Sequence, residues 1–415
     1  MRVTKRTLEA RKTPLWRLTI NAALLVAVSG CGADEQQVPP LQTQDPAPLS
    51  QEEVDRLRAI GYVGFTDTQV DPEAPPVRLY DRARSQPGYN TVANRDLAAV
   101  DLVDADGQTL HRWHDTQARH WSNAELLPGG DLLVPGSLRD EQGNFLLRMS
   151  WDGQTRWRRM INAHHDVEAR PDGKISTLLF RMRRIPEVDP EIDVKDHEVA
   201  VLDADGNLIG QRSLYDLLAS NPDEFEFLPV RPMPGNRPFI DLLHANSLEW
   251  MHQPHLESRS PLYAKGNVLV SFRHQDTVAI FDWEEEKLLW AWGQGEVSGQ
   301  HDATVLPNGN ILIFDNGLAR GSSRIVEVDP LLKEIVWEYE AEEPADFFSL
   351  RKGSSQRLAN GNTLIANSDN GDAFEVTRSG DLVWHYVNPR ADDKGRRATI
   401  VRIKRYPKAF IEPLL

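Results

Sequence analysis

One short pattern recurs along the chain: an apolar residue, a turn that contains glycine, and then a run of apolar residues. It reads LPGGDLLVPGS, RPDGKISTLLF, YAKGNVLVSFR, LPNGNILIFDN and LANGNTLIANS, and the glycines in register are Gly130, Gly173, Gly266, Gly309 and Gly361. Glycine between two short apolar runs is typical of a β-hairpin turn. A second hairpin follows each copy, as in VAVLDADGNLIG or FEVTRSGDLVWHY. Each repeat therefore predicts a four-stranded antiparallel unit.

The spacing of these glycines indicates a β-propeller. Successive intervals are 43, 93, 43 and 52 residues, and all but the long one are close to the length of a propeller blade. A sixth, partial unit begins at 95–113, and its missing strand can come from 396–407, which would leave no open sheet edge. We therefore expect an all-β chain with a six-bladed propeller over 89–415. Seven blades are the main alternative count.

Two regions depart from the repeat. The long interval marks an insertion at 181–243, in which SLYDLLASN predicts a short helix and FLPVRPMPGNRPF an irregular segment. Long irregular loops on a rigid scaffold often form the mouths of sites. Before the propeller, we expect a short amphipathic helix and a lead-in over 51–88, because Ser50 and Glu53 form a capping pattern ahead of apolar residues at helical spacing.

The first residues have the features of an export signal. Six basic residues precede the apolar run LTINAALLVAV, which is too short to span a bilayer. The sequence VSGC that follows resembles the bacterial lipobox, and Cys31 is the only cysteine in the chain, so no internal disulfide can form. We predict a lipoprotein signal peptide over 1–30, lipid attachment at Cys31 and a Pro/Gln-rich tether over 31–50. A plain secretory signal with a chance cysteine is the alternative.

This N-terminus predicts a protein of the bacterial cell envelope, anchored in a membrane and facing the periplasm. Gly32 after the cysteine favours the outer membrane. Removing 1–30 takes away six basic residues and Glu9, so the net charge falls from −15 to −20. Such an acidic chain argues against nucleic acid as a partner. A single chain leaves a homodimer open.

Two of the repeats carry a His-Asp pair at the same distance before the glycine. His165 and His301 both stand eight residues before it, each followed by Asp, and the stretch LLHANSLEW of the inserted repeat places His244 at the start of its strand. Because the first strand of each propeller blade lines the central channel, we expect the three histidines to converge there. Hydrogen bonding of each imidazole to the neighbouring blade is the alternative. Imidazoles can act as nucleophile, acid or metal ligand.

Two arginines suggest an anion site beside these histidines. Arg273 in LVSFRHQDT and Arg324 in GSSRIVEVD both lie where a second strand passes into a third. Guanidinium groups beside imidazoles suit sulfate, phosphate or carboxylate. A surface position of either arginine is the alternative.

Several motifs together resemble the bacterial arylsulfate sulfotransferases. They are HHDVEARPDGK, LLHANSLEW, LVSFRHQDTVAIFD, GQHDATVLPNGNILIFDNG, SSRIVEVD and SQRLANGNTLIANS, and the similarity covers nearly all of 89–390. The resemblance implies a six-bladed propeller enzyme of the cell envelope. Its members move a sulfuryl group from a phenolic sulfate ester to a phenol acceptor through a sulfated histidine, without a nucleotide donor. We expect no cofactor and no metal.

The resemblance also implies roles for single residues. His244 and His301 match histidines that hold the sulfate and protonate the phenolic oxygen, and Arg324 matches an arginine that binds the sulfuryl oxygens. Asn246 and Asp302 stand in the same motifs as the two histidines. Asn246, Asp302 and Arg273 are expected to contact the substrate.

The nucleophile is not matched in the same way. In the family it is a histidine late in the propeller, whereas FFSLRKGSSQRLANGNTLI contains none before its turn. His385 comes later, on the pattern of an outer strand, where we predict a structural role. His165 is therefore the remaining candidate for the nucleophile.

Two other classes of function stay open. One is a non-catalytic propeller that binds an anionic or aromatic ligand, or a partner protein, in the same channel. The other is a metal-dependent hydrolase, although histidines suit calcium poorly. The DADG segments at 104–108 and 203–207 lack the remaining ligands of a calcium loop, and they are expected to be turns.

Overall fold

The structure is a computed structural model that describes residues 62–415 except 140–142, 234 and 236. The predicted signal peptide, Cys31, the tether and the amphipathic helix all lie outside the described residues. Within the described part of the chain, no helix has the length and apolar character needed to cross a membrane.

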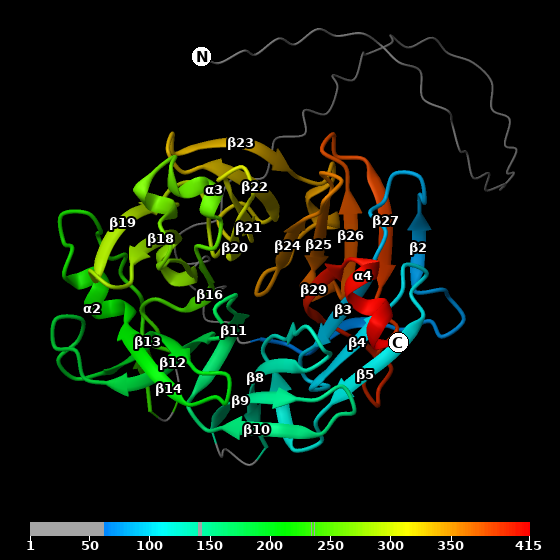
Figure 1. Cartoon of the computed structure of the whole chain (residues 1–415), viewed down its shortest axis with the longest axis horizontal. Coiled ribbons are helices and arrows are strands. Elements are labelled where there is room, and N and C mark those ends of the chain that lie inside the picture. The colour runs from blue at the N-terminus through cyan, green and yellow to red at the C-terminus, as the bar shows by residue number, and fades with distance from the viewer. Residues whose placement is uncertain (1–61, 140–142, 234, 236) are drawn as a thin grey trace, which may run out of the picture. The chain divides into compact units, whose positions relative to one another are not determined.

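Six antiparallel sheets stand in a ring around one axis (Figure 1), which confirms the predicted six-bladed β-propeller. The first blade consists of β29 (Ile400–Tyr406), β3 (Tyr89–Asn94), β4 (Ala99–Val103) and β5 (Thr109–His114). The second consists of β6 (Ala118–Trp121), β7 (Glu125–Leu126), β8 (Leu132–Leu138), β9 (Asn144–Met149) and β10 (Thr155–Arg159). The third consists of β11 (Ala163–Ala169), β12 (Ile175–Arg183), β13 (Asp193–Leu202) and β14 (Leu208–Ser213).

The other three blades continue in chain order. The fourth consists of β16 (Ala245–Trp250), β17 (Asn267–Phe272), β18 (Thr277–Asp282) and β19 (Lys287–Trp292). The fifth consists of β20 (His301–Val305), β21 (Ile311–Asp315), β22 (Arg324–Asp329) and β23 (Glu334–Tyr339). The sixth consists of β24 (Ser354–Arg357), β25 (Thr363–Asn367), β26 (Asp372–Val376), β27 (Leu382–Val387) and β2 (Val77–Tyr80).

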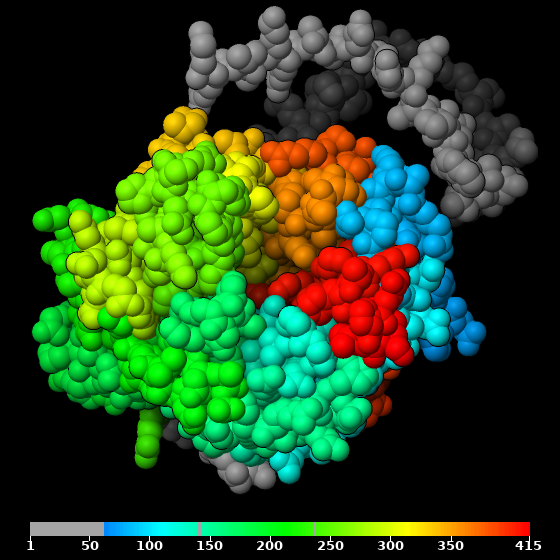
Figure 2. All heavy atoms as spheres, viewed as in Figure 1, coloured from blue at the N-terminus to red at the C-terminus, as the bar shows by residue number. Residues whose placement is uncertain are grey.

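The ring closes through the C-terminus. Strand β29 pairs with β3, so the last strand of the chain becomes the inner strand of the first blade. This pairing joins the two ends of the propeller in one blade. The helix α4 (Lys408–Ile411) and the turn η5 (Glu412–Leu414) follow, and they form the red segment in Figure 2. Ile411 packs into the apolar cluster between the first two blades.

The structure corrects two of the predicted boundaries. The region 62–88 is more than a lead-in, because β1 (Phe65–Gln69) pairs with β28 (Arg396–Ala398) and β2 adds a fifth strand to the sixth blade. The predicted insertion at 181–243 is also too long, since β13 and β14 are regular strands of the third blade. What departs from the repeat includes α2 (Leu214–Ala219), which Ser213 caps, and β15 (Phe239–Ile240), which adds to β13.

Short helical turns complete the described secondary structure. They are α3 (Pro254–Glu257), η1 (Pro261–Tyr263), η2 (Arg273–Gln275), η3 (Pro344–Asp346) and η4 (Ser368–Asn370). Of these, η2 directly follows the second strand of the fourth blade, and its first residue is Arg273.

The apolar core lies between the blades. Six clusters of buried apolar residues each join two neighbouring blades, for example Trp113 with Phe145, or Trp250 with Leu178. Alternation along each strand buries side chains on both faces of a sheet that has a blade on either side. Burial of this kind, at roughly 25 cal/mol per Å² of apolar surface, is the main term that holds the ring together. The axis itself is left to polar side chains.

Equivalent positions at the starts of the six inner strands form two rings around the axis, and most of their side chains are polar. We call the first the histidine ring. Its members are Ser122, His165, Asn246, His301, Gly353 and Val401. We call the second the stitching ring, which follows one residue later along each strand. Its members are Asn123, Asp166, Ser247, Asp302, Ser354 and Arg402.

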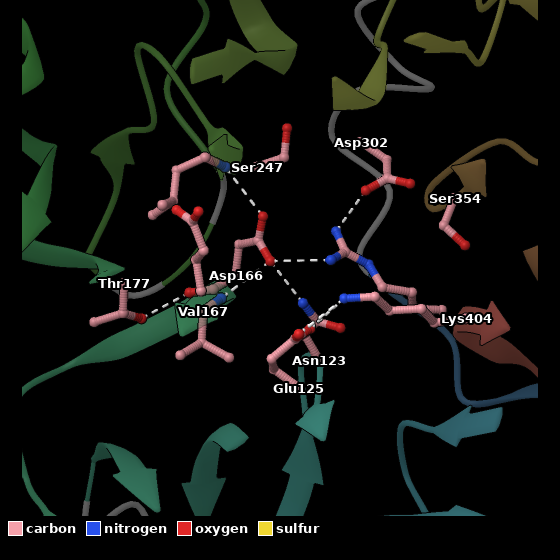
Figure 3. Close-up of polar contacts among 12 residues, drawn as sticks. Asn123, Glu125, Asp166, Val167, Thr177, Ser247, Asp302, Ser354 and Lys404 are labelled. Carbon is pink, nitrogen blue, oxygen red and sulfur yellow. Dashed lines mark hydrogen bonds and ion pairs between the residues drawn. The ribbon is translucent and has the colours of Figure 1, made fainter. Parts of the chain in front are cut away.

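The stitching ring ties blades together around the axis. Asp166 accepts a hydrogen bond from the backbone N–H of Leu248 at 3.0 Å, and Asp302 accepts one from Ser355 at 2.7 Å. Ser247 and Ser354 accept the corresponding bonds from the blades that follow them. Figure 3 shows the bonds of the labelled Asp166 and the ion pair of Asp302 with Arg402. Bonds of this kind satisfy backbone groups at an axis that has no sheet partner for them.

Candidate active site

A cavity of about 290 Å³ lies at one end of the axis, against the histidine ring. Five histidines and six basic side chains line it, and Asp302 is the single carboxylate among its described lining residues. The six basic residues are Arg95, Lys195, Arg273, Arg351, Lys352 and Arg402. In a chain of net charge −15, such a local excess of positive charge suits an anionic ligand.

The inner strands are kinked where they meet this cavity. His165, His244 and Asp302 adopt positive φ angles of 56°, 47° and 51°, which is uncommon for residues other than glycine. The pairing register shifts at the start of β11, β16 and β20. Such β-bulges re-aim side chains and are frequent beside active sites.

One ring nitrogen of His301 has no hydrogen-bond partner among the described residues. Its Nδ1 lies 2.7 Å from Oδ1 of Asn316, whose amide group donates to the carbonyl oxygens of Ser349 and Lys352. The Asn316 oxygen must therefore accept, so the proton sits on Nδ1 of His301. Nε2 is left with a lone pair and has no hydrogen-bond partner among the described residues. Burial, with a contribution from Arg273, lowers the pKa of His301 to about 3 and keeps this imidazole neutral.

His244 is held by a buried carboxylate. Its Nδ1 donates to Oδ2 of Asp241 at 2.7 Å, while the other oxygen of Asp241 lies 2.8 Å from Nε2 of His197. Burial lowers the pKa of His244 to about 4, although Asp241 acts in the opposite direction. Burial alone would raise the pKa of Asp241, but Lys195 and His244 hold it well below its usual range. This pair resembles the carboxylate and histidine of a hydrolase triad in its logic: the carboxylate fixes the tautomer and stabilises an imidazolium that forms in the reaction.

His165 is engaged at both nitrogens. Nε2 of His164 donates to the carbonyl oxygen of Leu179 at 3.0 Å, so Nδ1 of His164 accepts. That atom lies 2.5 Å from Nδ1 of His165, which therefore carries a proton. Nε2 of His165 is then an acceptor, and it lies 2.9 Å from the hydroxyl of Tyr62. Burial and the neighbouring His164 lower the pKa of His165 well below its usual value.

Arg273 is a buried cation of the site. It lies in η2, is 3% exposed and lines the cavity. Its Nη1 lies 3.0 Å from Nε2 of His274, whose Nδ1 donates to the backbone oxygen of Asp241 at 2.6 Å. These contacts fix the orientation of the guanidinium, and its charge acts on the pKa of both His301 and Tyr62.

Arg324 lies outside the lining of this cavity, which corrects its expected place beside the histidines, while its role in binding the sulfuryl oxygens stays a prediction. Its guanidinium contacts Asp315 at 2.9 Å and Glu338 at 3.0 Å, and it donates to the backbone oxygen of Glu296. It is absent from the lining of the cavity. Arg324 begins β22, the third strand of its blade, which lies away from the axis. There it neutralises the fully buried Asp315, a carboxylate that requires a cation.

The other predicted residues are placed as follows. Asp302 lines the cavity, but one of its oxygens binds Ser355 and the other binds Arg402 at 2.6 Å, so its carboxylate stitches blades together. Asn246 lines the cavity and donates to the backbone of Gln300, while its oxygen has no partner among the described residues. His244 lies two residues before Asn246, and it is Asn246 that occupies the position equivalent to His165.

Sequence reasoning missed several residues of the site. Tyr62, Lys195, Asp241 and His274 have no repeat signal of their own, although His274 directly follows Arg273. Lys352 could have been found from the repeats, because it directly precedes Gly353 in the register of His165 and His301. Its ammonium is buried, and burial lowers its pKa to about 8.

Asp241, His244 and His274 are close enough to hold a metal ion, since one ligand atom of each lies within 4.8 Å of the others. Both nitrogens of His274 are already engaged, however, and one of them faces the guanidinium of Arg273. A bound cation would have to displace this charge, which is unfavourable at a buried position. We therefore assign these three residues to hydrogen bonding.

The fold and the site together define a six-bladed propeller with a buried, cation-rich histidine pocket at its axis. The family model described as Arylsulfotransferase (ASST) matches residues 140–389, so the chain belongs to this family. This match confirms the resemblance drawn from the motifs.

Solved structures are also similar to this chain, and the first of them supports the fold alone. A protein of unknown function from Bacteroides caccae aligns with a TM-score of 0.50 and 14% identity over 77% of this chain and 98% of its own. The apo structure of AztD from Citrobacter koseri aligns with a TM-score of 0.40 and 11% identity over 76% of this chain and 96% of its own. A search of curated proteins finds no match.

Proposed function

We propose that this protein is an aryl sulfate sulfotransferase, which moves a sulfuryl group from a phenolic sulfate ester to a phenol without a nucleotide donor. The family membership supports sulfuryl transfer in general. The observation that carries the proposal is His301, a neutral imidazole that lines a cavity together with six basic residues and whose Nε2 has no hydrogen-bond partner among the described residues. The volume of about 290 Å³ is at the lower end for ligand pockets and suits a ligand with a single aromatic ring.

In the first half of the reaction, Nε2 of His301 attacks the sulfur atom of the donor. The N–S bond forms and the S–O bond to the aromatic ring breaks. The oxygen of Asn316 continues to accept the hydrogen bond from Nδ1–H of His301, so the sulfated imidazole keeps its orientation. Charge develops on the leaving phenolate and on the sulfuryl oxygens, where Arg273 stabilises it.

In the second half, the acceptor phenol replaces the Tyr62 hydroxyl at Nε2 of His244, transfers its proton to that nitrogen and attacks the sulfur atom. The S–O bond to the acceptor forms as the N–S bond to His301 breaks. Asp241, 2.7 Å from Nδ1, stabilises the imidazolium of His244. The same imidazolium then protonates the next leaving phenolate, so protons balance over the cycle.

This assignment changes the expected nucleophile from His165 to His301. Both imidazoles line the same cavity. His165 shares its two nitrogens with His164 and Tyr62, whereas His301 keeps one lone pair for substrate. A nucleophile needs that lone pair at the moment of attack.

The test follows release of nitrophenolate from 4-nitrophenyl sulfate by the full chain, with and without added phenol. We expect release that depends on phenol, and a loss of at least about 100-fold in the His301→Asn variant, as is usual when a nucleophile is removed. His385→Gln is the matched control, because His385 lies on an outer strand and contacts Asp372. Turnover that survives His301→Asn would contradict the proposal.

We also propose that Cys31 carries a lipid and that the propeller faces the periplasm from the outer membrane. The single cysteine, its position after VSG and the glycine that follows support this location.

A further inference from the structure

A phenol group of the chain itself lies in the active site. The hydroxyl of Tyr62 is 2.9 Å from Nε2 of His165 and 2.9 Å from Nε2 of His244. Its ring contacts both imidazole rings, with centroids 5.6 and 6.0 Å apart, and the guanidinium of Arg95 lies 5.4 Å from its centroid. Tyr62 therefore occupies a position that an acceptor phenol would take.

The two residues that follow Tyr62 are held by hydrogen bonds and close packing, which fix its position. The carbonyl oxygen of Val63 accepts from the buried ammonium of Lys352 at 2.8 Å and from the hydroxyl of Thr399 at 3.1 Å. The next carbonyl, of Gly64, accepts from the backbone N–H of Thr399 at 2.9 Å. A Cβ at Gly64 would approach Asp96 to 2.1 Å, so the close passage of the chain requires glycine here.

The hydrogen bonds place two proton acceptors at this hydroxyl, while burial raises the pKa of Tyr62 to about 12, so the proton must leave during the transfer itself. Nδ1 of His165 donates to His164, and Nδ1 of His244 donates to Asp241, so both Nε2 atoms are acceptors. Two accepting nitrogens thus face one phenolic proton. A buried phenol beside two bases has the chemistry of a nucleophile.

We propose that Tyr62 is itself a sulfuryl acceptor, so that the enzyme sulfates its own chain; this inference rests on the proposed function. The sulfuryl group carried on Nε2 of His301 passes to Oη of Tyr62. The N–S bond breaks, the S–O bond forms and the phenolic proton moves to Nε2 of His244 or His165. The product is an aryl sulfate ester on Tyr62. Its sulfuryl group can pass on to an external phenol.

The experiment incubates the full chain with 4-nitrophenyl sulfate in the absence of phenol, digests it with trypsin and analyses the peptides by mass spectrometry. Cleavage after Arg58 and Arg78 releases 59–78, which contains one tyrosine and no histidine. A sulfuryl group on this peptide cannot be carried by an imidazole. We expect the mark to approach one group per chain and to fall when phenol is added.

Two variants control the assignment. Tyr62→Phe keeps the ring and removes only the acceptor oxygen, so the mark on 59–78 should disappear, which also excludes the threonines of this peptide. Tyr80→Phe, in β2 and outside the cavity lining, should keep it. A thermal melt of each variant verifies that it is folded.

The outcomes separate this inference from the proposed function. The mark on Tyr62 would support both. Transfer to external phenol with no mark on 59–78, or a mark that survives Tyr62→Phe, would overturn the inference alone. If neither transfer nor mark occurs in the folded wild-type chain, both are overturned.

Discussion

Two histidines with the same spacing in the sequence have different surroundings in the structure. His165 and His301 each stand eight residues before a turn glycine. The partners of His165 are His164 and Tyr62, while His301 contacts Asn316 and keeps Nε2 free of described partners. The spacing predicted that both would reach the axis. The reactivity of each depends on partners supplied by other segments.

Burial of the neutral His301 imidazole makes stability depend on pH. Its pKa is about 3 in the folded chain and about 6.5 when unfolded. The unfolded state therefore binds more protons between these values, so this contribution is complete above pH 6.5 and is lost as the pH falls. We expect a loss of about 2 kcal/mol between pH 7 and pH 5 from this one group.

The measurement is urea unfolding of wild type and His301→Gln at both pH values. The comparison isolates His301, because the buried Glu249, whose pKa burial raises to about 8, acts in the opposite direction in both proteins. The difference in stability between pH 7 and pH 5 should shrink by about 2 kcal/mol in the variant. Equal differences in the two proteins would contradict the assigned state of His301.

At the scale of secondary structure elements, the inner strands combine catalysis with assembly. The His-Asp pairs predicted a functional histidine and a substrate-binding aspartate. In the structure, the aspartates of these pairs join neighbouring strands, and Arg402 of β29 lies between Asp166 at 3.2 Å and Asp302 at 2.6 Å. The sequence predicted that 396–407 would close the ring, but it gave no sign that Arg402 would balance two buried carboxylates.

Replacing Arg402 should weaken the ring. Arg402→Met leaves Asp166 and Asp302 buried without their cation, and breaking a buried pair in this way typically costs about 3–5 kcal/mol. The measurement is the free energy of unfolding in urea. The control is Arg82→Met, whose ion pair with Asp106 is exposed and should contribute almost nothing. A small effect of Arg402→Met would show that water or another cation compensates the carboxylates.

At the scale of the whole molecule, the repeats and both ends of the propeller determine the architecture. The glycine spacing predicted six blades, and the six interblade clusters account for the stability of the ring. The spacing did not predict that 62–80 would return to the propeller, with β2 on an outer edge and Tyr62 in the cavity. These residues belong to no repeat, so periodicity carries no information about them.

The proposed anchor acts on the molecule as a whole. Cys31→Ser removes the only thiol that could carry the lipid, so the variant should move from the membrane fraction to the soluble periplasmic fraction. Wild type and variant are compared by immunoblotting of fractions from the same cells. Membrane association that is unchanged in the variant would rule out Cys31 as the anchor.

The sequence by itself determined the class of fold, the family and the three histidines at the axis. Strand alternation, turn glycines and a fixed repeat are local signals, and equal repeats place equal positions at equal distances from the axis. Only the tertiary structure decided that Arg273 and not Arg324 reaches the cavity, that both oxygens of Asp302 bind the protein and that Tyr62 contacts two of the histidines. Each of these depends on which side chains from distant segments compete for the same hydrogen bonds, and no local pattern records that competition.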